Sequence, residues 1–99
     1  MDFVIKGFQW EAAKSEANLA KHGIDFDDAS SVFYKPNVVL QSNRNREERW
    51  IAVGEIESEL FAVIFTYRNG EIRIISARRA RKNEERTYRN AKMGRPQEG

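Results

Sequence analysis

The stretch LFAVIFTYRNGEIRIISARR, residues 60–79, carries the strongest local signal for the fold. Two apolar runs flank Asn69-Gly70, and both positions of such a pair tolerate the positive φ angles of a two-residue hairpin turn. We therefore predict adjacent antiparallel strands over residues 60–67 and 71–77. Residues 60–65 are apolar throughout, which is typical of a central strand that is covered on both faces.

The sequence before this hairpin predicts further strands. Residues 49–54 favour a strand that precedes the hairpin, and Val38-Val39-Leu40 favours another upstream of it. Residues 42–48 contain no apolar side chain, so we predict a loop there. A short first strand is predicted within residues 3–8.

Three helices are predicted. The first runs from Trp10 or Glu11 to Gly23, because glycine suits the left-handed residue that ends a helix. Its expected apolar stripe comprises Ala13, Ala17, Ala20 and Ile24. Asp25, with Asp28 at the third helical position, resembles a capping box for a short second helix to about residue 33. The last helix is predicted over residues 81–92.

These elements predict one small α+β domain over residues 1–92. Two helices follow a first strand, an antiparallel meander comes next, and a basic helix ends the domain. A chain of 99 residues is long enough to bury a single core. Residues 93–99 contain Gly94, Pro96 and Gly99 and are predicted to form a flexible tail.

The composition excludes several classes of function. The chain has no cysteine, which removes disulfides, thiolate metal sites and cysteine nucleophiles. It has one histidine and neither a glycine-rich phosphate loop nor a spaced set of metal ligands, so we expect no metal and no cofactor. It lacks an apolar run long enough for a membrane span, so we expect no membrane partner and a cytoplasmic location.

The charge is distributed unevenly along the chain. Residues 1–71 carry eight Lys/Arg and twelve Asp/Glu, a net charge of −4, whereas residues 72–99 carry nine and three, a net charge of +6. A localised basic region on an otherwise acidic chain favours a specific polyanion site. RNA is the expected substrate class, because its ribose 2′-hydroxyl supplies the nucleophile for cleavage. The protein then needs an acid, a base and cations, and arginine suits the last role.

Strand alternation divides the candidate arginines. In a regular strand Arg73 and Arg79 share one face, and Arg78 joins them only if the strand twists or ends before it. Tyr67 and Arg68 lie next to Arg73 across the predicted hairpin turn, and an aromatic ring beside arginines is a usual way to hold an unstacked RNA base. These residues thus form a candidate RNA site.

Simpler interpretations remain for each residue. Any single arginine is more often a solvated cation paired with Asp or Glu. His22 stands in the last turn of the first predicted helix, where a protonated imidazole is stabilised by the helix dipole. A non-catalytic module that binds nucleic acid or a protein through the same basic region is the alternative function.

Several motifs together resemble the BrnT family of toxins from type II toxin–antitoxin systems, over about residues 8–89. They are Trp10 with Lys14, Asn18 and Lys21-His22-Gly23, then EERWIAVGEI at residues 47–56, then Ile75-Ser76-Ala77-Arg78-Arg79-Ala80. The resemblance implies a RelE-like fold with helices on an antiparallel sheet. It also implies ribonuclease activity that inhibits translation, and a cognate ribbon-helix-helix antitoxin through which alone the toxin reaches operator DNA.

The family's functional positions fall on identifiable residues. The resemblance, together with the chemistry above, assigns catalytic roles to His22, Arg49, Tyr67, Arg73, Arg78 and Arg79, and RNA contacts to Lys21, Arg68, Arg81 and Lys82. His22 is the candidate acid or base, since histidine exchanges a proton near neutral pH. Two departures from the family pattern are Glu11, where Asp is common, and Arg81, where Thr is common. The second removes a hydroxyl helix cap that Glu84 would have completed as a capping box.

Overall fold

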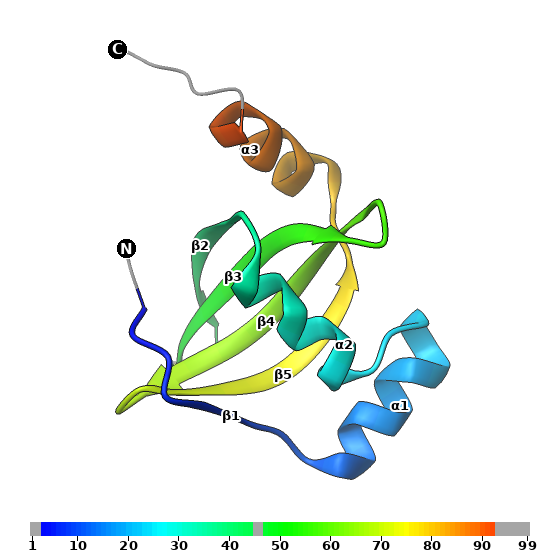
Figure 1. The fold of residues 1–99 in the computed structure, drawn as a ribbon, viewed down its shortest axis with the longest axis vertical. Helices are drawn as coiled ribbons and strands as arrows, with labels where there is room; N and C mark the ends of the chain where they lie inside the picture. The colour runs from blue at the N-terminus through cyan, green and yellow to red at the C-terminus, as the bar shows by residue number, and fades with distance from the viewer. Residues whose placement is uncertain (1–2, 45–46, 93–99) are drawn as a thin grey trace.

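The computed structural model describes residues 3–44 and 47–92, so the predicted tail at 93–99 lies outside the described residues. The elements follow the predicted order, with helices and strands arranged as in Figure 1. They are β1 (Gly7–Gln9), α1 (Ala12–His22), α2 (Phe26–Ser30), the 3₁₀ helix η1 (Ser31–Tyr34), β2 (Asn37–Arg44), β3 (Glu47–Ile56), β4 (Glu59–Arg68), β5 (Glu71–Arg79) and α3 (Lys82–Lys92). In the described part of the chain no helix is long and apolar enough to cross a membrane.

The strands form one sheet in the order β1-β5-β4-β3-β2. The hairpin at Asn69-Gly70 is confirmed, with positive φ angles of 54° and 86° at its two turn residues. β4 lies at the centre, as predicted from its apolar sequence. The sheet is mixed, however, because β1 pairs in parallel with β5. That pairing corrects the expectation of a purely antiparallel sheet.

The predicted loop at residues 42–48 is wrong for residues 42–44 and 47–48, and residues 45–46 lie outside the described residues. β2 continues to Arg44 and β3 begins at Glu47, with Ser42 directly opposite Arg49. A 3.0 Å cross-strand hydrogen bond from the Gln41 amide to the Glu48 carboxylate stabilises this part of the hairpin. Polar residues thus extend the strands, and Arg49 is held in a strand rather than in a loop.

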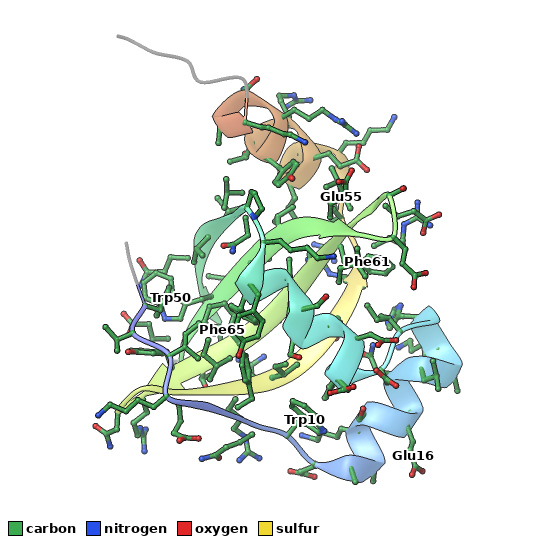
Figure 2. The ribbon with its side chains drawn as sticks, viewed as in Figure 1. Trp10, Glu16, Trp50, Glu55, Phe61 and Phe65 are labelled. Atoms are coloured by element: carbon green, nitrogen blue, oxygen red, sulfur yellow. The ribbon has the colours of Figure 1, made fainter. Side chains whose placement is uncertain are left out.

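The two faces of the sheet are covered differently. The helix face carries Ala52, Val63, Phe65, Ile72 and Ile74, which pack against α2 and η1 in the main core. Phe65 contacts Phe33 of η1 edge-on, with ring centroids 5.0 Å apart, and Figure 2 shows Phe65 and Trp50 on this side of the sheet. The opposite face, called here the open face, has α3 across one end only. There Tyr88 packs with Val53, Leu60 and Ala62.

A β-bulge in β5 corrects the predicted strand alternation. Phe65 pairs with Ile74 and Ile64 pairs with Ser76, so Ile75 is an extra residue with no partner opposite it. Beyond the bulge, Ala77 lies in the main core on the same face as Ile74, which regular alternation forbids. The bulge also changes which arginines share a face. Arg73 and Arg78 share the open face, whereas Arg79 follows Ala77 to the helix face.

Helix α1 packs through polar side chains instead of the predicted alanine stripe. Its alanines are exposed, and its buried residue is Asn18. The Asn18 amide donates to the Ala77 carbonyl at 2.9 Å and to the Ile24 carbonyl at 2.8 Å, and its oxygen accepts from the Ala77 N–H at 3.3 Å. Asn18 therefore supplies hydrogen-bond partners to the backbone groups on the edge of β5, beyond the point where β1 ends. Ser15 and His22 lie on the same side of α1 and are half-buried.

Candidate functional site

A polar depression of about 440 Å³ lies on the open face beside the start of α3. Its floor is formed by apolar side chains from four strands, namely Leu40, Ile51, Ile64 and Ile75. Its rim carries three arginines, Arg49, Arg78 and Arg81, with Ser42, Ser76 and Asn83. The bulge at Ile75 brings Ser76 and Arg78 to this face, so the depression depends on that irregularity. The site therefore combines an apolar floor with a cationic rim.

Arg78 is held by a carboxylate of α3. Its Nη1 lies 2.8 Å from Glu84 Oε1 and its Nη2 lies 2.9 Å from Glu84 Oε2, a two-pronged ion pair. Glu84 also accepts a 2.8 Å hydrogen bond from the Arg81 backbone N–H, which is one half of a capping box. The Glu84 carboxylate therefore caps the start of helix α3 at the Arg81 N–H.

The electrostatics of Glu84 follow from these contacts. Burial alone raises the pKa of the Glu84 carboxyl, since only 5% of its side chain is exposed. The hydrogen bonds from Arg78 and from the Arg81 backbone, together with both positive charges, outweigh burial and hold the pKa below its ordinary value. The carboxylate is therefore ionised at neutral pH.

A second depression of about 590 Å³ lies at the hairpin end of the sheet and contains Arg68, Arg73 and Glu48. Arg73 is half-exposed there and forms a 3.1 Å ion pair with Glu11, the residue that precedes α1. The predicted grouping of Arg68 with Arg73 is thus found. These two arginines do not line the depression that contains Arg78.

Tyr67 has a structural partner. Its ring packs edge-on against Phe3 with centroids 4.7 Å apart, and its hydroxyl donates a 2.6 Å hydrogen bond to the Val4 carbonyl. Its ring packs against the main core on the helix face, whereas Arg73 is on the open face. Tyr67 thus lines the hairpin-end depression together with Arg68 and Arg73, as predicted, while its ring packs toward the helix face.

Arg79 is also separated from Arg78. It lies opposite Phe61, its guanidinium is 5.9 Å from the centre of that ring, and it pairs with Glu59 at 3.1 Å. Its side chain is 62% exposed, against 19% for Arg78. The predicted grouping of Arg73 with Arg79 on one face is wrong, and the bulge is the reason.

His22 is the last residue of α1 and lies toward the C-terminal end of β5. α1 and β5 run in the same direction, because Gln9 pairs with Arg73 and Asn18 contacts Ala77. His22, one helical turn beyond Asn18, therefore lies toward the end of β5 that carries Arg78 and Arg79. It does not line the depression, and the helix ends at Gly23, whose N–H donates to the Leu19 carbonyl.

The two predicted lysine contacts are on helices. Lys21 is exposed in the last turn of α1, and Lys82 is exposed at the first position of α3. Lys82 follows Arg81 and so adds charge near the rim of the depression. Among residues 3–44 and 47–92, no three His, Asp or Glu side chains are grouped so that they would hold a metal ion.

The sequence interpretation missed Glu84 as a site residue. The one available signal was its place in an incomplete capping box after Arg81. Its pairing with Arg78 depends on the path of the chain between β5 and α3, which local pattern does not specify. Ser42 was missed because it was placed in a loop.

The family described as "Ribonuclease toxin, BrnT, of type II toxin-antitoxin system" matches residues 10–84. The crystal structure of the Brucella abortus ribonuclease toxin BrnT is similar, with 31% sequence identity and a TM-score of 0.64 over 77% of this chain and 97% of that one. Comparison with curated proteins yields no match. With three quarters of its residues matched by the family and its fold shared with a solved member, the chain belongs to the BrnT family of ribonuclease toxins of type II toxin–antitoxin systems.

Proposed function

We propose that this protein is a metal-independent endoribonuclease that cuts RNA by attack of a ribose 2′-hydroxyl on the adjacent phosphate. The O2′–P bond forms as the P–O5′ bond breaks, which leaves a 2′,3′-cyclic phosphate and a 5′-hydroxyl. A base takes the proton of the 2′-hydroxyl, and an acid protonates the departing O5′. The observation that most supports this proposal is that Arg49, Arg78 and Arg81 line one depression on the open face.

The arginines have distinct proposed roles. Arg49 and Arg78 bind the phosphate whose negative charge grows in the transition state, and Arg81 with Lys82 attracts the flanking backbone. Arg68 and Arg73, in the second depression, bind RNA further along the same face. The half-buried apolar floor offers a surface on which a base can rest.

His22 is the proposed acid or base, with Lys21 beside it as an RNA contact. The support is its chemistry and its position toward the Arg78 end of β5. The competing role, a cation at the C-terminal end of α1, predicts a loss of stability without a loss of cleavage. We leave Tyr67 and Arg79 outside the phosphate site, because the Tyr67 ring and Arg79 lie on the helix face, where Tyr67 donates to the Val4 carbonyl and Arg79 pairs with Glu59.

A cognate ribbon-helix-helix antitoxin is the proposed partner, through which the toxin contacts operator DNA. The basic rim of the depression supports an acidic antitoxin segment as the blocking element, since opposite charges favour that contact. The alternative function is binding of nucleic acid without cleavage. It is supported by the same arginines and differs only in the fate of the RNA.

The test uses the purified protein, a defined RNA and an excess of EDTA. We expect cleavage in the chelator, with new ends that carry a 2′,3′-cyclic phosphate and a 5′-hydroxyl when mapped by primer extension and end analysis. Salt-dependent binding with intact RNA would support the alternative function instead. Cleavage that disappears with EDTA would contradict the metal-independent mechanism alone.

A further inference from the structure

We propose that Glu84 is a positioning residue that fixes the orientation of Arg78 for RNA cleavage, an inference that rests on the proposed function. The two carboxylate oxygens of Glu84 receive the Nη1 and Nη2 groups of Arg78 at 2.8 and 2.9 Å. Both side chains are largely buried, with 19% of Arg78 and 5% of Glu84 exposed. Such a pair holds a guanidinium in one plane.

The remaining donors of Arg78 show what this orientation leaves available. A guanidinium has five N–H groups, and the Glu84 pair uses one on each Nη atom. Nη1 also lies 3.3 Å from the Arg79 carbonyl oxygen. The Nε–H and the second Nη2–H, which form one planar edge, have no hydrogen-bond partner in the described part of the chain. That edge is able to receive two phosphate oxygens while Glu84 stays bound.

Glu84 also connects this orientation to the docking of α3. Its Oε1 accepts from the backbone N–H of Arg81, at the start of the helix, as well as from Arg78. Four residues later Tyr88 packs α3 against the open face. The carboxylate is therefore fixed by its own helix, and Arg78 is fixed by the carboxylate.

A purely stabilising role explains the pair less well. Burying two charges costs desolvation energy that their attraction often fails to recover, so an apolar pair of similar volume is commonly as stable. Orientation, by contrast, requires this chemistry, because a preorganised donor stabilises transition-state charge without rearranging during the reaction. Arg78 lies on the rim of the depression, where an oriented guanidinium can contact the phosphate of bound RNA.

The first experiment compares Glu84→Gln with Glu85→Gln, a matched loss of charge at the next helix position, whose side chain lines a different groove. Glutamine keeps the size of the side chain but cannot accept both Arg78 prongs. We expect Glu84→Gln to lower kcat about tenfold or more, as for the loss of one preorganised donor. We expect its Kd for RNA with a 2′-deoxy residue at the cut site to stay within about twofold, and Glu85→Gln to match the unchanged protein.

The second experiment repeats the change in an Arg78→Ala background. If Glu84 acts through Arg78, Glu84→Gln adds no further loss of kcat there. An equal loss in both backgrounds, an unchanged kcat in the single variant, or a Kd that weakens in step with kcat would each overturn the positioning role. Absence of cleavage by the unchanged protein overturns the proposed function and this role with it, whereas normal cleavage with an insensitive Glu84→Gln overturns the role alone.

A spectroscopic measurement on the unchanged protein covers the case in which Glu84→Gln does not fold. In ¹⁵N-labelled protein, we expect the Arg78 side chain to show separate Nη proton signals, because the two-pronged pair slows rotation about the Cζ–Nη bonds. Arg79, whose side chain is 62% exposed and whose Nη1 pairs with Glu59 at 3.1 Å, serves as the internal control with averaged signals. Averaged signals for Arg78 would show that Glu84 does not hold it and would overturn the proposal.

Discussion

Arg78 and Arg79 are neighbours in sequence but lie in contrasting regions of the molecule. Arg78 is on the open face, largely buried, and held by two hydrogen bonds to Glu84. Arg79 is on the opposite face, exposed, and paired with Glu59 at the surface. Ile75, three residues before Arg78 and four before Arg79, decides which of the two arginines reaches the depression, because the β-bulge lies there. The same residue type thus serves different purposes according to strand geometry.

The largest expected effect contrasts the open face with the helix face in RNA cleavage. We expect Arg49→Ala to lower kcat/KM by about 10²-fold or more, because it removes one donor to the transition-state phosphate. Arg79→Ala is the matched control, and we expect a change below about threefold, in keeping with an exposed surface pair. Initial rates on one labelled RNA measure both. A larger loss in Arg79→Ala would reverse the assignment of the two faces.

The next effect concerns the edge of β5 that supports the bulge. Asn18→Ala removes the amide that bonds the Ala77 and Ile24 backbones, and unpaired buried groups cost about 1–3 kcal/mol each. We expect the free energy of unfolding in urea to fall by about 2 kcal/mol or more. Asn90→Ala, exposed on α3, is the control and is expected to change stability by less than about 0.5 kcal/mol. Equal stability of the two variants would remove Asn18 as a support of β5.

His22 provides a smaller effect that separates chemistry from helix capping. As an acid or base, its replacement by alanine should lower kcat by well over about tenfold while the protein stays folded. The pH–rate profile should lose one limb in the same variant. A variant that cleaves RNA normally, yet unfolds at about 0.3–1 kcal/mol lower free energy, would establish the helix-terminal role instead.

The smallest effect tests whether Tyr67 belongs to the core or to the site. Tyr67→Phe keeps the ring against Phe3 but loses the hydroxyl that donates to Val4. We expect a loss of about 1 kcal/mol in unfolding free energy and unchanged cleavage. A fall in kcat/KM without a change in stability would return Tyr67 to the RNA site.

Elements with local signals were predictable from the sequence. Asn69-Gly70 fixed the hairpin, Gly23 ended α1 in the left-handed conformation, and the Asp25 side chain caps α2 by accepting from the Asp28 N–H at 2.8 Å. In the described part of the chain, the Asp28 side chain does not return a hydrogen bond to the Asp25 N–H, so half of the predicted capping box is formed. Each signal needs only a few neighbouring residues, which is why it can be read without a structure.

Features that depend on distant contacts were not predictable. The exposed alanines of α1 look like a buried stripe, yet Asn18 is buried because the edge of β5 needs hydrogen-bond partners. The bulge at Ile75 has no local marker, since both neighbouring positions carry ordinary strand residues. The structure brings three of the predicted arginines, Arg49, Arg78 and Arg81, around one depression, whereas the division of the arginines between the two faces could not be read from the sequence.

One measurement tests most directly whether the open face is the RNA site. Amide signals of ¹⁵N-labelled protein are followed during titration with a short RNA that carries a 2′-deoxy residue at the cut site. We predict that signals of the open face, such as those of Ile64 and Ser76, shift in a saturable manner. The signals of Ala29 in α2 and Val32 in η1, which pack on the helix face, should stay fixed. Shifts confined to α1, α2 and η1, with Ile64 and Ser76 unmoved, would contradict the account.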